Sequence, residues 1–400
     1  MRWVYKAAEE YCESVRDGTH DTPKQTEFGY RLVTGKHIKN GQIDPSDAYY
    51  ISEKDYTKIN ERSLVEQWDV LMSMIGTVGE VAVVQDVPNY AIKNVALFKC
   101  GGSEVRGKWL AYYLRSSEAQ GHMMGHQKGS SQQFLSLKQL RSLPIPVTDV
   151  EYMQKVVDIL SVYDELIENN QKQIKLLEEA AQRLYKEWFV DLCFPGYENT
   201  PITDGVPQGW HIRKLDTFGE IITGKTPSTA KESYYNGDIP FVKIPDMHNT
   251  IYPIITESTL SEEGANTQKN KFIPKDSLMV SCIATVGLVN ISIQNCQTNQ
   301  QINSIILDSV RDLYYLYFLT KGLKMLLDGV GSNGATMTNV NKSKFANVEV
   351  LYPTDDLCEQ FYDFCKPIFK KMLSLSKSTI ELQNSRDQLL PKLMSGELEV

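Results

Sequence analysis

The chain has 400 residues, 42% of them hydrophobic and 23% charged, and its formal net charge is −8 at pH 7. This composition is that of an ordinary globular protein, and the length exceeds what one hydrophobic core usually serves, so we expect two or more domains. No apolar run reaches the roughly 18 residues needed to span a bilayer, and the N-terminus lacks the apolar core of a signal peptide. We therefore expect a cytoplasmic protein without a membrane partner.

The acidic balance does not by itself favour nucleic acid as a partner, yet the excess acid is concentrated in one segment. Residues 151–195 carry 9 acidic and 5 basic side chains. The larger segments before and after it are close to neutral, so either can carry a basic face. The seven cysteines are scattered without a Cys-x-x-Cys pair, which predicts reduced thiols rather than a zinc site or a disulfide framework.

Residues 1–150 are predicted to form a first domain of mixed helix and strand. Within it, "DVLMSMIGTVGEVAVV" (69–84) contains two short β-type runs joined at Gly79, a residue that suits a turn. The segment 108–124 has the 3.6-residue periodicity of one helix. This combination indicates an α+β domain.

A long helix is predicted over residues 151–193, as a spacer after the first domain. Its apolar residues alternate at spacings of four and three for about five heptads, with Asn170 as the polar member that would fix the register. Such a seam favours a partner helix, although packing onto the helix's own domain would also bury it. The seam residues are Val156, Leu160, Tyr163, Ile167, Asn170, Ile174, Leu177, Ala181, Leu184 and Trp188.

The second half of the chain repeats the first. "DSLMVSCIATVGLVNIS" (276–292) corresponds to 69–84, with Gly287 in the place of Gly79. Further similar segments are 31–43 with 240–252, and 129–147 with 334–352. Residues 194–354 are therefore predicted to be a linker rich in Pro and Gly (194–210) and a second domain like the first, again with one helix, at 311–329.

The last segment, residues 355–400, is predicted to be a second long helix with the same spacing. Its seam is weaker because Thr379 and Arg386 interrupt it, and Pro367 is expected to kink the helix. The other seam residues are Phe361, Cys365, Ile368, Met372, Leu375, Leu382, Leu389 and Leu393. The predicted fold class is α+β, with two mixed-sheet domains in tandem, separated by two long helices that form an antiparallel coiled coil.

"GEIITGKTPS" (219–228) matches the phosphate-binding pattern G-x-x-x-x-G-K-[ST] at Gly219–Thr226. A phosphate cradle needs flexible residues, but three of the four variable positions are β-branched and Glu220 would repel phosphate. The corresponding stretch of the first repeat, "RDGTHDTPK" (16–24), aligned on Pro23 and Pro227, has no G-K-[ST]. We therefore predict that the match is fortuitous. No other motif for catalysis or metal binding stands out, so we expect no catalytic site and no metal site on this chain.

A family resemblance rests on four segments. "VPQGWHIRKLDTFGEIITGKTPSTAKESYYNGDIPFVKIPDM" (206–247) resembles the opening of a target recognition domain in the DNA-specificity subunits of Type I restriction-modification enzymes. "RDGTHDTP" is similar to a variant of the same element, "LEEAAQRLYKEWF" to the central helix of the family, and "SRDQLLPKLMSGELEV" to its C-terminus. The resemblance covers essentially the whole chain. One departure is that the first repeat lacks the P-x-G-W entry.

The resemblance implies a bacterial or archaeal, non-catalytic subunit that recognises double-stranded DNA. Each domain would read one half of a bipartite, asymmetric target, while the helices fix the gap and dock methyltransferase subunits, expected in two copies. Restriction and translocase subunits would join the full complex. S-adenosylmethionine, ATP and Mg²⁺ are expected on those partner subunits, with no cofactor on this chain.

The base-reading residues are expected among polar loop residues, because Arg and Lys suit guanine and Asn and Gln suit adenine. In the first domain the candidates are Arg16, Thr19, His20, Lys24, Lys36, His37, Lys39, Asn40, Lys128, Ser130, Ser131, Gln132 and Gln133. In the second they are Lys225, Thr226, Ser228, Lys243, Asn249, Asn299, Gln300, Gln301, Asn333, Thr336 and Asn339. Any one of them can instead be a solvated loop residue or a phosphate contact.

Two alternative functions remain open at this point. One is a P-loop NTPase acting on DNA through Gly219–Thr226, and the other is a structural adaptor built on the helix pair without base specificity. Magnesium-dependent ATP binding that is lost in Lys225→Ala would indicate the first. Binding of methyltransferase subunits without sequence preference on DNA would indicate the second.

Overall fold

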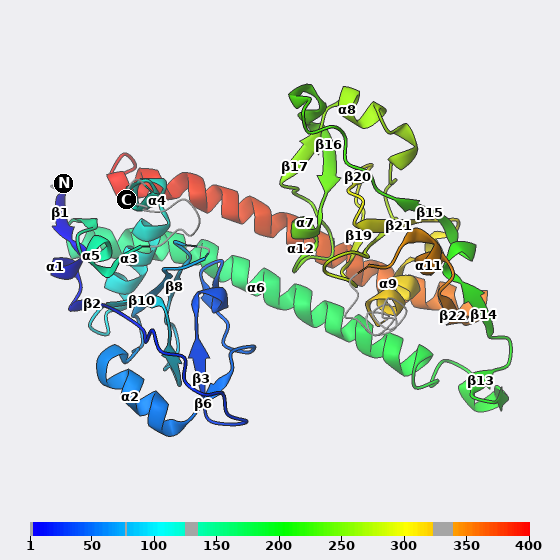
Figure 1. Ribbon diagram of the computed structural model, residues 1–400, viewed down its shortest axis with the longest axis horizontal. Helices are drawn as coiled ribbons and strands as arrows, with labels where there is room; N and C mark the ends of the chain where they lie inside the picture. Colours follow the sequence, from blue (N-terminus) through cyan, green and yellow to red (C-terminus); the bar gives the residue numbers. More distant parts are fainter. Residues whose placement is uncertain (1–2, 77, 125–134, 323–338) are drawn as a thin grey trace. The chain divides into compact units, whose positions relative to one another are not determined.

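The computed structural model describes residues 3–76, 78–124, 135–322 and 339–400. Contacts between residues divide the chain into two compact units: unit 1 consists of Met1–Ile167 with Glu381–Val400, and unit 2 of Glu168–Ile380. Each unit combines helices with short strands, as predicted (Figure 1). The domain boundaries predicted from the sequence, after residues 150, 193 and 354, remain a prediction. In the part of the chain that is described, no helix has both the length and the apolar composition for crossing a membrane.

The core of unit 1 is built on a four-stranded antiparallel sheet with the order β2-β10-β7-β8. Its strands are β2 (Ser14–Asp17), β10 (Val95–Lys99), β7 (Val70–Ser73) and β8 (Val81–Val83). Val70 and Met72 pack in a cluster with Trp109 on one face, whereas Leu71, between them, packs with Ile92 on the other. The continuous apolar run in the sequence is thus a strand that is buried on both sides.

A second sheet in unit 1 has the order β6-β3-β9, in which β3 and β9 are parallel. Its strands are β3 (Tyr30–Val33), β6 (Tyr50–Ile51) and β9 (Tyr90–Ile92). The smaller β elements are the pair β1 (Val4–Ala7) and β11 (Pro144–Val147) and the hairpin β4 (Ile38–Lys39) and β5 (Gln42–Ile43). The short helices are α1 (Ala8–Tyr11), η1 (Gly35–His37), α2 (Glu53–Ser63), α3 (Glu104–Arg115), α4 (Ser117–Met124) and α5 (Leu137–Arg141).

Two helices, α3 and α4, occupy the segment 108–124 for which the sequence predicts one. Ser116 lies between them in an extended conformation, and its Oγ accepts a hydrogen bond from the Ala119 N–H at 3.3 Å. A serine side chain can satisfy a free N–H at the start of a helix, so a new helix begins here despite the unbroken apolar periodicity. The prediction of a single helix is therefore wrong.

Unit 2 repeats the strand order of unit 1. Its four-stranded sheet has the order β15-β21-β18-β19, and its three-stranded sheet has the order β17-β16-β20 with β16 and β20 parallel. These strands are β15 (Gly219–Thr223), β16 (Tyr235–Val242), β17 (Ser258–Leu260), β18 (Leu278–Ser281), β19 (Val289–Ile291), β20 (Gln297–Thr298) and β21 (Ile302–Leu307). The pair β14 (His211–Lys214) and β22 (Glu349–Tyr352) corresponds to β1 and β11. The duplication inferred from the sequence is confirmed.

The remaining elements of unit 2 lie in the linker and between the strands. The linker contains the hairpin β12 (Ile202–Thr203) and β13 (Val206–Pro207) after η2 (Tyr197–Asn199). The short helices are η3 (Leu215–Thr217), η4 (Glu232–Tyr234), α7 (Ile244–Met247), α8 (Glu262–Asn266), η5 (Lys269–Lys271), η6 (Val310–Asp312), α9 (Leu313–Gly322) and α11 (Lys342–Ala346). The predicted turn glycines are confirmed, since Gly79 and Gly287 have φ of 93° and 90°. All seven cysteines are free thiols, as predicted, and six of them are buried.

Backbone hydrogen bonds define which residues of the two units are equivalent. The Thr19 N–H donates to Ile92 O at 3.0 Å, and the Lys225 N–H donates to Thr298 O at 2.9 Å. The glycines before them, Gly18 and Gly224, pass so close to the neighbouring strand that a Cβ would lie 2.3 Å from Ile92 O and 2.2 Å from Thr298 O. Gly18 therefore corresponds to Gly224.

This register corrects the sequence alignment on Pro23 and Pro227, which is shifted by two residues. The glycine is the fixed point because only a residue without a side chain allows this approach. The prolines lie in the loops that follow, where lengths can differ between the repeats. Lys225 then corresponds to Thr19, so the first unit still has no lysine at this position.

The strand β15 also decides the phosphate-loop question. Gly219–Thr223 pairs residue by residue with β21, so the variable positions of the motif belong to a strand and cannot form a loop around phosphate. Gly219 has φ of 152°, and a Cβ there would lie 1.9 Å from Ile306 O. Both glycines of the motif are thus required by strand packing. The prediction that the match is fortuitous is confirmed.

The two long helices are α6 (Val150–Phe189) and α12 (Asp355–Ser395), close to the predicted bounds, and α12 continues through Pro367. In unit 1 the Tyr152 hydroxyl donates to Leu393 O at 2.9 Å, and Arg386 Nη1 lies 2.6 Å from Asp164 Oδ1. Higher positions on α6 meet lower positions on α12, so the helices are antiparallel here. Arg386, which interrupts the apolar seam, is paired with a carboxylate.

The helices are antiparallel within unit 2 as well. Asn170 Nδ2 lies 3.4 Å from the Ser378 hydroxyl, and the Trp188 and Phe361 rings are 5.9 Å apart. All predicted seam residues on both helices are buried or half-buried. By contrast, Leu176, which lies off the seam on α6, is 64% exposed. The predicted seams thus face protein in both units.

Replacing Gly224 by Ala tests the strand interpretation. The added Cβ would lie 2.2 Å from both Thr298 O and Asn299 O, so we expect the free energy of unfolding to fall by about 2 kcal/mol or more. Gly322→Ala is the control, because no atom of the described residues lies within 4 Å of the added Cβ, and this change should not lower the free energy of unfolding by more than about 0.5 kcal/mol. Calorimetric unfolding of the two variants measures the difference. Equal stability of both would contradict the register assigned to β15 and β20.

Leu177 and Leu176 give a matched test of the α6 seam. Leu177 packs against the core of unit 2, whereas its neighbour Leu176 is exposed. Leu177→Asp puts a charge into an apolar contact and should lower the free energy of unfolding by about 2–4 kcal/mol. Leu176→Asp should change it by no more than about 0.5 kcal/mol. Denaturant unfolding compares them, and an equal effect would show that the predicted seam does not face protein.

Candidate nucleic-acid interface

In each unit, three segments meet at the same edge of the three-stranded sheet because its central and last strands are parallel. In unit 1 the Thr19 N–H bonds to the end of β9, and the Lys93 N–H donates to Val33 O, at the end of β3, at 2.9 Å. The carboxyl ends of β3 and β9 and the loop after β2 therefore adjoin. We define edge 1 as residues 16–20, 34–40 and 93–94, and edge 2 as residues 223–226, 243–249 and 299–301. In this definition 223–226 correspond to 17–20, 243–249 to 34–40 and 299–300 to 93–94.

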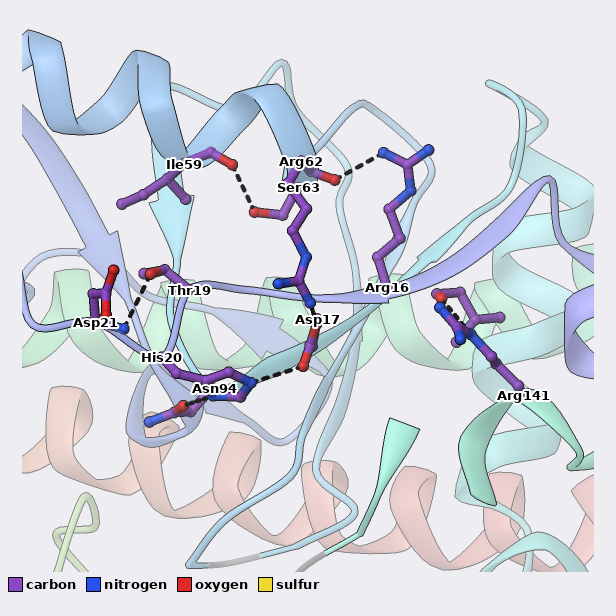
Figure 2. A network of polar contacts seen from close by, with 11 residues as sticks. Arg16, Asp17, Thr19, His20, Asp21, Ile59, Arg62, Ser63, Asn94 and Arg141 are labelled. Atoms are coloured by element: carbon purple, nitrogen blue, oxygen red, sulfur yellow. Dashed lines mark hydrogen bonds and ion pairs between the residues drawn. The ribbon is translucent and has the colours of Figure 1, made fainter. Parts of the chain in front are cut away.

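A polar network centred on Asp17 organises edge 1 (Figure 2). The Asp17 side chain is only 7% exposed, and its two carboxylate oxygens contact Arg62 Nη2 and His20 Nε2, the latter at 3.0 Å. The other ring nitrogen of His20, Nδ1, lies 2.7 Å from Asn94 Oδ1. Arg16 Nη1 donates to the backbone O of Arg62 at 2.8 Å. The network thus fixes exposed basic side chains around a buried acid.

Arg62 is absent from the residues predicted from the sequence, as are Lys93 and Asn94. Arg62 lies in the last turn of α2, and Ser63 next to it donates from Oγ to Ile59 O at 3.0 Å within the same helix. Neither the pattern of α2 nor its charge indicates that its end reaches the loop after β2. Lys93 donates to Thr22 Oγ1, so a further loop residue is anchored here.

His37 is buried and serves the backbone of edge 1. Its Nδ1 accepts a hydrogen bond from the Thr34 N–H at 2.8 Å, and burial lowers the pKa of His37, which favours the neutral ring that can accept. Its Nε2 lies 3.2 Å from Asp47 Oδ1, and Lys36 Nζ lies 3.1 Å from the other oxygen of Asp47. His37 therefore closes the start of η1, and its ring is not presented to solvent.

Edge 2 has the same backbone but neutral side chains at its centre. The Asn299 N–H donates to Val242 O at 3.2 Å, as Lys93 does to Val33. Thr226 Oγ1 lies 2.7 Å from Gln300 Oε1. Thr223 occupies the position of Asp17, and its Oγ1 donates to Asn303 Oδ1 at 2.6 Å. Hydroxyl and amide groups thus replace the carboxylate, guanidinium and imidazole of edge 1.

Lys243 is not a free cation at edge 2. Its Nζ lies 2.7 Å from Glu257 Oε2, and this hydrogen bond lowers the pKa of Glu257. Asp246 holds the same segment, because its carboxylate accepts the Lys243 N–H and the Glu257 N–H, both at 2.8 Å. Binding of Lys243 to any anion must compete with Glu257.

The predicted candidates differ in their accessibility. Exposed candidates are Arg16, His20, Lys24, Lys36, Lys39, Asn40, Lys225, Ser228, Asn249, Gln300 and Asn339. Half-buried candidates are Thr19, Thr226, Lys243 and Gln301, and buried ones are His37 and Asn299. Lys128, Ser130, Ser131, Gln132, Gln133, Asn333 and Thr336 lie outside the described residues. The edges therefore collect most, but not all, of the described candidates.

Asn339 lies close to edge 2, because the backbone of its neighbour Val340 is connected to Gln301 by hydrogen bonds through Cys282. The Val340 N–H donates to Cys282 O at 2.8 Å, and the Cys282 N–H donates to Gln301 O at 2.8 Å. In unit 1 the Leu135 N–H makes the corresponding bond to Met74 O at 3.4 Å. The equivalence of Leu135 and Val340 agrees with the sequence repeat of 129–147 in 334–352.

Comparisons of the chain with a family model and with known proteins agree on one family. The family model described as "Type I restriction modification DNA specificity domain" matches residues 3–179 and 207–390. The Type I restriction enzyme HindI specificity subunit of Haemophilus influenzae is 30% identical over 403 aligned positions, which cover 84% of this chain and 88% of that protein. The MjaIX specificity subunit of Methanocaldococcus jannaschii is 26% identical, with 100% and 94% covered.

A solved structure shares the fold. The S subunit of a Type I restriction-modification system from M. genitalium superposes with a TM-score of 0.56 at 16% identity, covering 98% of this chain and 96% of the other. The two matched segments, 3–179 and 207–390, each contain one domain and the greater part of the long helix that follows it. The chain belongs to the family of Type I restriction-modification DNA specificity subunits, with two specificity domains in tandem.

Proposed function

We propose that edge 1 and edge 2 each read one half of a bipartite, asymmetric target in double-stranded DNA. The observation that carries this proposal is that one backbone arrangement occurs twice with different side chains. Thr19 and Lys225 make the same hydrogen bond, yet a carboxylate with basic partners lies beside it at edge 1, and hydroxyls with amide partners lie beside it at edge 2. Since side-chain chemistry determines base readout, the two half-sites should differ.

The residue types at both edges suit base recognition. Guanidinium groups pair with guanine and side-chain amides with adenine, and hydroxyl groups serve several bases. Exposed lysines such as Lys39 at edge 1 and Lys225 at edge 2 suit phosphates, which take half or more of the contacts in protein–DNA complexes. The net charge of −8 does not oppose this, because the contacts depend on local groups at the edges.

We further propose that α6 and α12 fix the gap between the half-sites and dock methyltransferase subunits, expected in two copies. In unit 1 the exposed residues Val162 and Leu166 lie one turn apart on α6, off the seam. In unit 2, Leu176 of α6 and Phe364 of α12 are exposed as well. Apolar side chains on the outside of a paired helix suit contact with another protein.

Catalysis is proposed to reside on partner subunits, as is binding of cofactors. S-adenosylmethionine would be bound by the methyltransferase subunits, and ATP and Mg²⁺ by restriction and translocase subunits, in the cytoplasm. The P-loop alternative is not supported, because Gly219–Thr223 is a strand. The adaptor alternative predicts methyltransferase binding without sequence preference, and the following experiment distinguishes it.

Exchange of the first domain tests the two-reader proposal. Residues 1–150 are replaced by the first domain of another family member, and the chain is co-expressed with its methyltransferase subunits. Only one half of the methylated sequence should change, because edge 2 and the helices are retained. Methylated adenines are mapped by sequencing of the host DNA.

The reciprocal exchange of residues 194–354 is the control and should change the other half only. The gap should persist in both chimaeras. A first-domain exchange that alters both halves together would show that the domains do not read independently. Methylation without sequence preference in the parent complex would favour the adaptor alternative.

Glu257→Gln should strengthen DNA binding because it releases Lys243 from its ion pair. We expect affinity to rise a few-fold and the slope of log affinity against log salt to steepen by about 1, as for one additional phosphate contact. Glu262→Gln, which removes an exposed carboxylate from α8, controls for net charge. Titration of a target duplex at several salt concentrations compares them. An equal effect of both changes would mean that Lys243 makes no contact with DNA.

A further inference from the structure

The position of Asp17 distinguishes the two edges most sharply. Its backbone environment recurs in unit 2, where Thr223 precedes Gly224 as Asp17 precedes Gly18. Thr223 has a neutral partner, Asn303, whereas Asp17 has two basic partners, Arg62 and His20. Positions that keep their backbone hydrogen bonds but change their chemistry are where two readers of different sequences should differ.

Burial of the Asp17 carboxylate requires compensation. Placing an ionised carboxylate away from water is unfavourable unless charged or hydrogen-bonding partners surround it. Arg62 and His20 supply these partners, while their own side chains remain 63% and 62% exposed. The arrangement therefore holds two basic side chains at the surface in a fixed orientation, which lowers the conformational entropy lost on binding.

The two basic side chains differ in what they can still bind. Both ring nitrogens of His20 are engaged, one by Asp17 and the other by Asn94. Arg62 contacts Asp17 through Nη2, and among the contacts of the described residues none involves its Nη1 or Nε. A guanidinium has five N–H donors in a planar fork, so Arg62 retains several for a ligand.

We propose that Arg62 is a specificity-determining residue of the first domain that reads a guanine, and that Asp17 and His20 are positioning residues that hold its guanidinium. This inference rests on the proposed function of edge 1. Guanine fits because its O6 and N7 acceptors lie side by side in the major groove and match two parallel N–H donors. Edge 2, with Thr223 and Asn303 at the equivalent place, lacks this means of reading guanine.

Arg16 adds support from the backbone. Its Nη1 donates to the carbonyl of Arg62 at 2.8 Å, so the last turn of α2 is held by two adjacent residues of β2, Arg16 and Asp17. The base of the Arg62 side chain and its guanidinium are therefore both held. Bidentate readout depends on such alignment, whereas a phosphate contact tolerates a mobile cation.

The experiment uses this chain in complex with its methyltransferase subunits and selection from a library of randomised duplexes. The variants are Arg62→Gln, Arg62→Lys and Asp17→Asn, with Lys58→Gln, one turn earlier on the exposed side of α2, as the matched control. The wild-type complex should prefer G·C at one position in the half-site assigned to residues 1–150. Arg62→Gln should reduce that preference by about 10- to 100-fold and leave the other positions unchanged.

The remaining variants separate reading from charge and from folding. Arg62→Lys keeps the charge but loses the fork, so it should lose most of the preference while retaining overall affinity. Asp17→Asn should relax the same position to a smaller extent. Lys58→Gln should leave every base preference unchanged. Thermal unfolding of each complex shows which variants are folded. If Asp17→Asn unfolds, Arg62→Lys still tests the proposal, because it changes only the exposed end of the side chain.

Two outcomes would overturn the inference. One is a uniform loss of affinity for all sequences in Arg62→Gln with a shallower salt dependence, which identifies a phosphate contact. The other is that the base preferences at the first half-site are the same in Arg62→Gln and in the wild-type complex, with no G·C preference lost. Absence of any base preference in the folded wild-type complex would instead refute the proposed function itself.

Discussion

A backbone hydrogen bond next to a glycine is the constraint on which both edges depend. The loop after β2 bonds through Thr19 to the last carbonyl of β9, and the loop after β15 bonds through Lys225 to that of β20. Each bond requires a close approach of chain to chain that only Gly18 or Gly224 permits. Because the loop is fixed by main-chain atoms, its side chains can vary without loss of the fold. This separation of scaffold from side chain is what a duplicated reader of two different sequences needs.

The two edges use this freedom in opposite ways. Edge 1 buries Asp17 and surrounds it with basic groups, whereas edge 2 joins hydroxyls to amides, as in the contact of Thr226 with Gln300. At edge 2 the cation of Lys243 is already occupied by Glu257. The charge available to a ligand at each edge therefore depends on a few neighbouring side chains, and the net charge of −8 does not indicate it. If the two edges read the two half-sites as proposed, their different sets of charged groups, with Lys225 as an exposed cation of edge 2, should give different salt dependence at the two half-sites.

The acidic character of α6 also has a structural explanation. In unit 1, Asp164 accepts a hydrogen bond from the Tyr112 hydroxyl at 2.9 Å and pairs with Arg386 of α12. In unit 2, Glu178 accepts a hydrogen bond from the Tyr317 hydroxyl at 2.6 Å. These two carboxylates attach a domain helix, α3 or α9, to the long helix. Part of the acid that is concentrated in residues 151–195 therefore contacts this chain itself.

The sequence by itself determined the duplication, the two long helices with their seams, the turns at Gly79 and Gly287, and the fortuitous nature of the phosphate-loop match. These features follow from local periodicity and from comparison of one half of the chain with the other. Only the tertiary structure decided which polar residues meet. Arg62 joins edge 1 from 45 positions away in sequence, and His37, a predicted reader, is buried. The physical reason is that the edges are formed by pairing between strands that are distant in the sequence. The periodicity within one segment does not indicate which other segment it pairs with.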